Sequence, residues 1–543
     1  MYVSATKEEF KMANKKLFGN KRTGPAASVP TDTINNAGGV AYKMNAQHEL
    51  AQLVFTGCFN GTYYVSAKSQ MDRVLDLCKK IESHEFLAKV AVCGREQGFM
   101  KDAPAMVLAV LASRDIELVK LIWPRVINNV KMLRTFIQIL RSGVTGRKSF
   151  GTAIKRLINK QLGSMTPANL FKNSIGNDPS MADIIKMVHP KGQSGDELRG
   201  EMYAYLIGKE YNTKKLPEVV QQFEQYKKSK DCPIPNLPFQ FLDSLGLDSK
   251  GWAHIASTCT WQTLRMNLNT FERHDVWKNA KMIDEVAKKL ADRKLIVEAN
   301  CFPYQLLMAY KAASSAPVKI SNALQQAMEI ATENTPTYEG QVYVCVDSSG
   351  SMSSPVTGHR GSATTAVCCS DVAALFAASI LRKNPNTEVI PFDTNVHLVQ
   401  LNPMDSIMTN AQKLAHHGGG TACSVALNYL NREGKRGDLV IFISDNESWF
   451  DSYNSVTCRQ GSNKAEEWDA FKRRNPKAKL VCIDITPNDT VQVAESKDVL
   501  NVGGFNDRVF NVVREFQTGR NWVDVINGIN LRNTSSVIQD EED

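Results

Sequence analysis

The sequence predicts an α + α/β protein, in which a long helical-repeat region is followed by a doubly wound α/β domain. From about residue 45 to residue 330, apolar residues recur at three- and four-residue spacing, which is typical of amphipathic helices. After residue 335, short apolar runs alternate with helical segments, which indicates a parallel sheet covered on both faces. A chain of 543 residues is also too long for one hydrophobic core. We therefore expect at least two domains, with a boundary near residue 335.

The helical region has no strict sequence repeat. Helical spacing is clearest at 71–81, 114–140, 151–162 and 321–331, and turn-forming sequences such as GNDPS at 176–180 separate these segments. Many short amphipathic helices in succession favour irregular helix pairs stacked as an α-solenoid.

The C-terminal region reads as alternating strands and helices. Strands are predicted at 341–347, 387–393, 438–445 and 478–485, and helices at 364–384, 422–437 and 466–475. Ligands of such sheets bind outside the carboxyl ends of the strands, where Asp347 and Asp445 both fall.

The stretch DSSGS at 347–351 begins at the end of the first of these strands and limits the kinds of site that this edge of the sheet can form. No glycine stands two residues before Ser348 or Ser349, which excludes the nucleophile elbow of α/β-hydrolases. A phosphate-binding loop requires a lysine after its glycines, and this stretch contains none. An aspartyl-phosphate site normally has a second carboxylate two residues after the first, but here that residue is Ser349. The pattern that remains, Asp-x-Ser-x-Ser, offers hard oxygen ligands suited to Mg²⁺ or Mn²⁺.

Two further oxygen ligands complete a recognisable set. Thr421 follows the glycine run 418–420 and opens a predicted helix, and Asp445 ends the strand 438–445. With Asp347, Ser349 and Ser351 they resemble the metal-ion-dependent adhesion site (MIDAS) of von Willebrand factor A (vWA) domains. The alternative is a polar loop with a helix-capping threonine. Since no general base lies in the motif, we expect ligand binding and no enzymatic activity.

Charge is divided unevenly along the chain. Residues 1–340 hold 46 Lys and Arg against 32 Asp and Glu, a balance of +14, whereas residues 341–543 hold 19 against 24, a balance of −5. Residues 101–160 alone hold 12 basic and 3 acidic residues. This asymmetry favours an anionic partner for the helical region, with nucleic acid the leading candidate. The alternative is that the basic residues only solvate helix faces.

The cellular compartment is also suggested by composition. The 12 cysteines are scattered without a C-x-x-C pair, and the N-terminus has no apolar signal region. No apolar run approaches the ~20 residues of a membrane span. We expect a cytoplasmic protein without membrane contact.

Motifs in both regions resemble the Ro autoantigen family. They are 55–66 (FTGCFNGTYYVS), 146–161 (GRKSFGTAIKRLINKQ), 181–191 (MADIIKMVHPK), 301–312 (CFPYQLLMAYKA), 416–427 (HHGGGTACSVAL) and 442–450 (FISDNESWF). The resemblance implies a distant, bacterial-type member with a ring of HEAT-like helical repeats, the TROVE domain, closed by a vWA domain. The expected divisions are an extension at 1–34, the TROVE ring at 35–335, the vWA domain at 336–535 and an acidic tail at 536–543.

The resemblance also implies a function and partners. Ro-like proteins bind small non-coding Y RNAs on the outer surface of the ring and admit single-stranded 3′ ends of misfolded RNAs into its central hole. In bacterial relatives the RNA links the protein to an exoribonuclease such as polynucleotide phosphorylase. We therefore expect a monomeric protein within a ribonucleoprotein that serves RNA quality control. The alternative is a protein-binding adaptor that grips an acidic partner through the metal site.

Nine residues are candidates for RNA contact. The segment 141–160 supplies Arg141, Arg147, Lys148, Lys155 and Arg156, and it also contains Lys160. Lys148, Lys155 and Arg156 are spaced to lie on or just ahead of one helical face. The resemblance adds Lys172, His189, Lys191 and Arg265, although Arg265 has apolar neighbours that suit a buried structural residue equally well. Gly176 stands where Ro proteins place an arginine. Y RNA is therefore not expected to be contacted in every detail as it is in those proteins.

Overall fold

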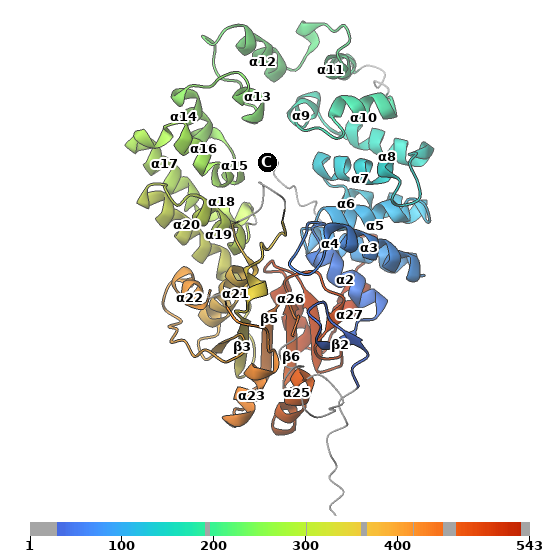
Figure 1. Ribbon diagram of the computed structural model, residues 1–543. Helices are drawn as coiled ribbons and strands as arrows, with labels where there is room; N and C mark the ends of the chain where they lie inside the picture. The colour runs from blue at the N-terminus through green and yellow to red at the C-terminus, as the bar shows by residue number, and fades with distance from the viewer. Residues whose placement is uncertain are drawn as a thin grey trace, which may run out of the picture.

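The computed structural model describes residues 30–190, 196–299, 301–359, 366–415, 418–448 and 463–533. Lys191, the acidic tail 536–543 and most of the predicted extension 1–34 lie outside the described residues. Helices occupy the chain up to Ala331 and a sheet domain follows, so the predicted α + α/β fold class is confirmed (Figure 1). Among the described residues, none of the helices combines the length and the apolar character that crossing a membrane requires.

The helical part consists of consecutive helices of 4 to 14 residues. They are α2 (Ala46–Thr56), α3 (Ala67–Lys80), α4 (His84–Glu96), α5 (Asp102–Leu111), α6 (Ile116–Val126), α7 (Val130–Ser142), α8 (Gly151–Ser164), α9 (Pro167–Lys172), α10 (Met181–Val188), α11 (Glu197–Ile207), α12 (Glu218–Lys228), α13 (Gln240–Asp243), α14 (Ser249–Thr258), α15 (Trp261–Met266), α16 (Leu268–Arg273), α17 (Ala280–Leu290), α18 (Arg293–Glu298), α19 (Pro303–Ala312) and α20 (Val318–Ala331).

Local capping decides where these helices begin and end. The helical spacing predicted across 114–140 is divided between α6 and α7, because the Asn129 side chain accepts a hydrogen bond from the Met132 N–H and starts a new helix. Gly143, with φ of +83°, then ends α7 in the left-handed conformation that glycine adopts without strain. The apolar periodicity across 114–140 therefore predicted helical structure correctly, but it did not predict the break between α6 and α7.

The sheet domain contains five parallel strands in the order β4-β3-β5-β6-β8. Its elements are β3 (Val342–Asp347), the 3₁₀ turn η4 (Gly350–Ser353), α21 (Cys369–Lys383), β4 (Glu388–Phe392), α22 (Ile407–Leu414), α23 (Ser424–Arg432), β5 (Leu439–Ser444), α25 (Asn463–Arg474), β6 (Lys479–Asp484), β8 (Val499–Gly503), α26 (Val509–Gln517) and α27 (Trp522–Asn527). Because the chain moves from β3 to β4 on one side and to β5 on the other, the order reverses at β3. The crevice at such a reversal lies at the carboxyl ends of β3 and β5.

Side chains alternate between the two faces of this sheet. Cys345 and Phe442 belong to a core shared with α23 and α25. Val344 and Ile441 face the opposite way, into a core shared with α21 and α26 that continues into the helical part of the chain. The sheet domain is therefore doubly wound, and one of its two cores is continuous with the helical region.

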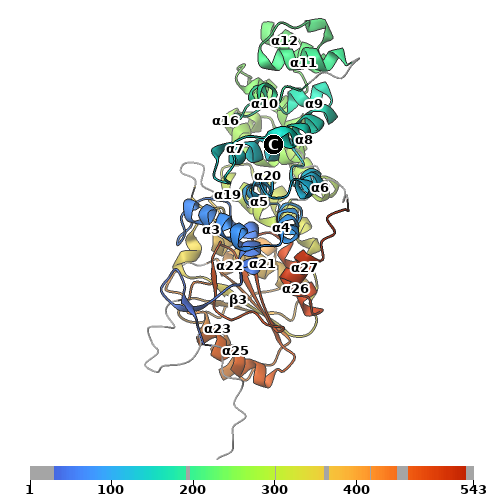
Figure 2. The ribbon, with the colours of Figure 1, turned by 90° about the vertical axis from the view of Figure 1, so that its right-hand side faces the viewer.

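The helices form an arc that rises from one side of the sheet domain and returns to its other side (Figure 1). In the side view of Figure 2, α11 and α12 lie farthest from the sheet. At this far end Phe171 of α9 packs against Phe223 of α12 and Phe241 of α13, with ring centroids 5.6 and 4.6 Å apart. Phe239 then contacts Trp252 of α14 at 5.7 Å, so aromatic packing joins the two arms.

Both ends of the arc are fixed to the sheet domain. At the first end, His48 of α2 shares a hydrogen bond with the carbonyl oxygen of Asn501 in β8, 2.6 Å apart. At the other end, Lys311 of α19 forms an ion pair with Asp371 of α21, also at 2.6 Å. The arc is thereby closed into a ring by the sheet domain, which is the architecture expected from the resemblance.

A small antiparallel sheet was not predicted. It contains β1 (Thr33–Ile34), β2 (Val40–Lys43) and β7 (Thr490–Val491), in the order β1-β2-β7. Strands of two residues carry no periodic signal, and β7 pairs with a segment from the other end of the chain. This sheet attaches the N-terminal segment to the sheet domain.

Candidate metal centre and nucleic-acid interface

The five predicted metal ligands lie at the carboxyl edge of the large sheet. Asp347 is the last residue of β3, and Asp445 directly follows β5. Ser349 directly precedes η4, and Ser351 lies within it. Thr421 lies in the loop ahead of α23 and not in its first turn. All five side chains are buried.

Hydrogen bonds hold three of these residues together. The Asp347 carboxylate accepts one hydrogen bond from the Ser349 N–H at 2.8 Å and another from the Ser444 hydroxyl at 2.6 Å. The Ser349 and Ser351 hydroxyl oxygens are 3.3 Å apart. The Ser444 hydroxyl therefore connects the end of β5 to Asp347 at the end of β3.

The loop that carries Thr421 packs against the β3 loop through its backbone. The Gly350 N–H donates to the carbonyl oxygen of Gly419 at 3.2 Å, and the Gly418 N–H donates to that of Ser348 at 3.0 Å. All three predicted ligand-bearing loops thus meet at one end of the sheet.

The electrostatics of this edge favour a cation. Burial raises the pKa of Asp347, and burial together with the neighbouring Asp347 charge raises the pKa of Asp445 to about 7. Across the described ranges, neither carboxylate forms an ion pair with lysine or arginine. The buried ammonium group of Lys464 favours ionised Asp347, but its Nζ lies 3.3 Å from Asn446 Oδ1 and 3.4 Å from Cys482 Sγ. Two buried carboxylates and three hydroxyls, in a site short of positive charge, fit a divalent cation.

Two more buried carboxylates at this edge were missed. Asp484 ends β6 beside Ser444 in the sheet register, and Glu447 follows Asp445 by two residues. Burial and the nearby Asp445 charge raise the pKa of Glu447 to about 8 and that of Asp484 well above its ordinary value. The position of Asp484 at the end of a predicted strand is the signal in the sequence that points to a further carboxylate at this edge.

The predicted basic face lies on α8. Ile154, Ile158 and Leu162 point into the core, while Arg156 and Lys160 are exposed on the other side of the helix, and Lys155 is half-buried at its edge. In Figure 1, α8 lies toward the outer edge of the ring.

Lys148 is exposed just ahead of α8. Within the part of the chain that the structure describes, Lys148, Lys155, Arg156 and Lys160 have no acidic partner. Basic side chains without acidic partners are available for phosphate contacts.

Two arginines of the predicted RNA set are engaged inside the protein. The Arg147 guanidinium donates to the carbonyl oxygens of Ala112, Ser149 and Phe150. Arg265 is 8% exposed and donates to Gln262 Oε1 and to the carbonyl oxygen of Gln305, each at 2.9 Å. The structure does not support Arg265 as an RNA contact, because its burial and partners give it a structural role.

The remaining predicted RNA residues lie nearby on the same arm of the ring. Lys172 ends α9 and is half-buried, His189 is exposed at the C-terminal cap of α10, and Arg141 is exposed at the end of α7 with its Nη1 2.8 Å from Met187 Sδ. His189 has φ of +50°, so its backbone is held in the left-handed region.

The space beside Gly176 contains another arginine. A Cβ atom at Gly176 would lie 2.8 Å from Nη1 of Arg134, whose Nη2 donates to the carbonyl oxygen of Asn173 at 2.9 Å. A guanidinium group therefore lies beside the position at which the sequence lacks an arginine. This residue comes from α7 and was missed, since only the tertiary fold brings it there.

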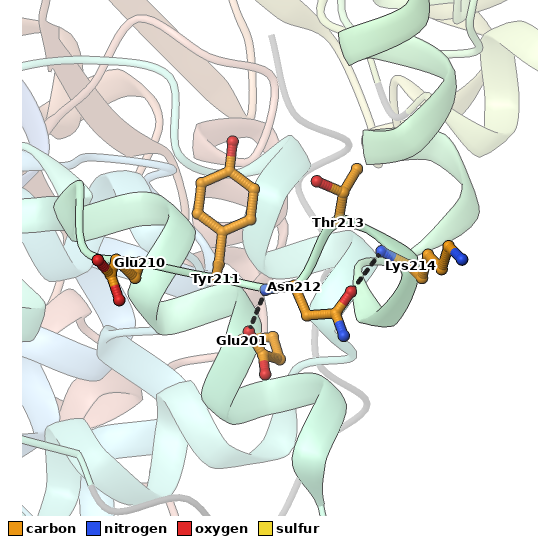
Figure 3. Close-up of a pocket in the computed structure, with 6 residues that line it drawn as sticks. All are labelled: Glu201, Glu210, Tyr211, Asn212, Thr213 and Lys214. Atoms are coloured by element: carbon orange, nitrogen blue, oxygen red, sulfur yellow. Dashed lines mark hydrogen bonds between the residues drawn. The ribbon is translucent and has the colours of Figure 1, made fainter.

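A shallow pocket of about 640 Å³ lies between α11 and the segment 210–214 that leads to α12, at the far end of the ring (Figure 3). It is lined by Glu201, Glu210, Tyr211, Asn212, Thr213 and Lys214. None of the nine predicted RNA residues lines it, and its two carboxylates make it a poor site for phosphate.

Comparison with known proteins agrees with this architecture. Residues 341–517 match the family model of the Ro60 vWA domain. The crystal structure of the Deinococcus radiodurans RO (RSR) protein is similar to the chain with a TM-score of 0.61 and 17% sequence identity. The similarity covers 88% of this chain and 100% of that protein.

Proposed function

We propose that this chain, which is Ro-type in its sheet domain and in its overall fold, is a non-catalytic RNA-binding protein. The premises are that residues 341–517 match the Ro60 vWA domain family and that the fold is similar to that of the RO (RSR) protein. Its RNA would be a small Y-like non-coding RNA held on the outer face of α8. Single-stranded 3′ ends of misfolded RNA would enter at the centre of the ring, and an exoribonuclease would act on them.

One observation carries this proposal. A basic surface is formed by Lys148, just ahead of α8, and by Lys155, Arg156 and Lys160 of α8. These side chains have no acidic partners in the described chain, and α8 lies at the outer edge of the ring. Phosphate contacts of this kind position an RNA by its shape and backbone and do not read its sequence.

The test is whether RNA accompanies the protein and how it binds. We expect the protein purified at low salt to retain small RNA, visible as a raised ratio of absorbance at 260 and 280 nm and identified by sequencing. The affinity of the stripped protein should fall steeply with salt, and an RNA with a free 3′ single strand should bind more tightly than a blunt duplex. Binding that is flat in salt and equal for both RNAs would contradict the proposal.

A divalent cation is the second part of the proposal. Asp347, Ser349, Ser351, Thr421 and Asp445 would hold Mg²⁺, or Mn²⁺, which has the same preference for oxygen ligands. Bound there, the cation would neutralise the buried carboxylates. The donor set, and the lack of an ion pair from either carboxylate to lysine or arginine in the described chain, support this assignment.

A pair of arginine variants separates structural from RNA-binding roles. We expect Arg265→Met to lower the free energy of unfolding by about 1–3 kcal/mol, because the buried Arg265 side chain loses its hydrogen bonds to Gln262 and to the carbonyl oxygen of Gln305. Arg156→Met should leave stability unchanged and weaken RNA binding about fivefold, as expected for one lost phosphate contact. Urea denaturation and RNA titration of both folded variants measure the two effects. The reverse pattern would place the RNA contact at Arg265.

A further inference from the structure

The N-terminal end of the described chain forms a strap, residues 33–43, that is attached to the sheet domain. Its strands β1 and β2 pair with each other, and β2 also pairs with β7, where Tyr42 lies opposite Val491. In Figure 1, β2 lies beside the sheet domain and not within the arc of helices. The strap therefore belongs structurally to a domain that is formed by the other end of the chain.

The turn of the strap contacts the loop that contains Asp445. Asn36 Nδ2 donates a hydrogen bond to Glu447 Oε1 at 2.9 Å, and the Ala37 N–H donates to Glu447 Oε2 at 3.2 Å. Glu447 is fully buried, and within the described residues it forms no ion pair with lysine or arginine. Neutral donors from the strap therefore hold both oxygens of a buried carboxylate.

Glu447 in turn contacts a proposed metal ligand. Its backbone N–H donates to Asp445 Oδ1 at 3.2 Å, so the orientation of the Asp445 carboxylate depends on where residue 447 is held. A second connection runs through Asn488. Its Nδ2 donates to the Asp445 carbonyl oxygen at 2.5 Å, and its Oδ1 lies 3.4 Å from Asn36 Nδ2. Asn36 is therefore linked to the Asp445 loop through both Glu447 and Asn488.

The strap is also linked to the loop that carries Thr421. Asn35 is buried, and its Nδ2 donates to the carbonyl oxygen of Ser448 at 2.7 Å. The Ser448 hydroxyl donates to the carbonyl oxygen of Thr421 at 3.3 Å and accepts a hydrogen bond from the Cys423 N–H at 3.0 Å. Two proposed ligands on different loops, Thr421 and Asp445, are thus connected to consecutive residues of the strap.

We propose that Asn36 is a positioning residue of the metal centre, and that attachment of the strap and binding of a divalent cation favour each other. This inference rests on the proposed metal site and adds to it a segment from the other end of the chain. The strap holds residues 447 and 448, and these hold the Asp445 carboxylate and the Thr421 backbone in the arrangement that a cation would bind. By thermodynamic linkage, a cation that binds this arrangement also stabilises the attached strap.

Isothermal titration with Mg²⁺ tests the effect of the strap on the cation. Asn36→Ala, a change at the protein surface, should weaken Mg²⁺ binding about 3- to 10-fold. Residues that bond directly to a metal ligand typically contribute about 10- to 100-fold, and the effect is smaller here because Glu447 lies between Asn36 and Asp445. A residue with a purely structural role would change stability and leave the Mg²⁺ affinity of the folded protein unaltered.

Hydrogen exchange tests the reciprocal effect of the cation on the strap. In the unmodified protein, saturating Mg²⁺ should slow exchange of the Ala37 amide at least about 3-fold, because this N–H donates to Glu447. In Asn36→Ala this slowing should largely disappear. An Ala37 amide that exchanges at the same rate with and without bound Mg²⁺ in the unmodified protein would overturn the linkage.

Asn395→Ala is the matched control. Asn395 is an exposed asparagine in the loop after β4, at the same edge of the sheet, and its side chain bonds to the neighbouring Thr394. This variant should keep the Mg²⁺ affinity of the unmodified protein. Equal Mg²⁺ affinity in Asn36→Ala would overturn the role of Asn36 and leave the metal site standing. Failure of the unmodified protein to bind Mg²⁺ would overturn both proposals.

Discussion

Charge reversal on the outer face of α8 is expected to lower affinity for RNA by about 10- to 100-fold. The variant is Lys148→Glu, Arg156→Glu and Lys160→Glu, which changes three exposed side chains that have no acidic partner in the described residues. Loss of three phosphate contacts should also reduce the slope of log K against log salt by about 2 to 3. Filter binding or fluorescence anisotropy over a salt series measures both quantities.

A matched variant on the opposite arm distinguishes binding at α8 from a general effect of the protein's net charge on its affinity for RNA. Lys281, Lys288 and Lys294 are exposed on α17 and α18, across the ring from α8 (Figure 1). Their reversal to glutamate changes the net charge by the same amount and should lower affinity by less than about threefold at physiological salt. Equal losses in the two variants would show that RNA responds to total charge and that α8 is not the binding face.

The carboxyl edge of the sheet could be predicted because its signals are local. Asp347 ends an apolar run, and Asp445 follows another with only Ser444 between them. The carboxyl ends of parallel strands meet at one edge. Thr421 follows a glycine run ahead of a helix, so its placement depends on the same strand–helix alternation. These residues could be grouped without any knowledge of long-range contacts.

Residues whose roles depend on distant partners could not be assigned in this way. Arg147, Arg156 and Arg265 look alike in sequence, yet Arg147 donates to three backbone carbonyls, Arg265 is buried, and Arg156 is exposed. Arg134 likewise comes to lie beside Gly176 only in the folded chain. Helix periodicity predicts which face of a helix a residue occupies, but it does not predict which residues of other helices or strands that face contacts.

The burial of the candidate metal ligands also bears on the adaptor alternative. An adaptor of the adhesion type presents its cation to the acidic group of a partner, which requires an accessible approach to the metal. Here all five candidate ligands are buried, and Asn60 of the ring donates a hydrogen bond to the Thr357 carbonyl oxygen, close to η4. Exposed basic side chains without an acidic partner among the described residues lie instead on and just ahead of α8. This arrangement favours the RNA-binding proposal over the adaptor.

The cation should have its largest effect on thermal stability. In the metal-free protein, two buried carboxylates lie close together without an ion-pair partner among the described residues, and such an arrangement is costly. We expect Asp445→Asn to melt at the same temperature as the unmodified protein or higher in EDTA, because one of the repelling charges is gone. The asparagine Oδ1 can still accept the hydrogen bond that the Glu447 N–H donates to Asp445 at 3.2 Å.

Addition of Mg²⁺ should reverse this order. At a concentration 100 times its dissociation constant, a ligand that binds only the folded state stabilises it by about 2.7 kcal/mol. The unmodified protein should gain this stability, whereas Asp445→Asn and Asp347→Ala should gain almost none, with RNA affinity retained in both. Asp405→Asn, which changes a more exposed carboxylate paired with Lys413 at 3.0 Å, is the control and should keep the full Mg²⁺ response. A Mg²⁺ response that persists in Asp445→Asn would place the cation elsewhere, and a joint loss of metal and RNA binding in a folded variant would show that the two sites are coupled.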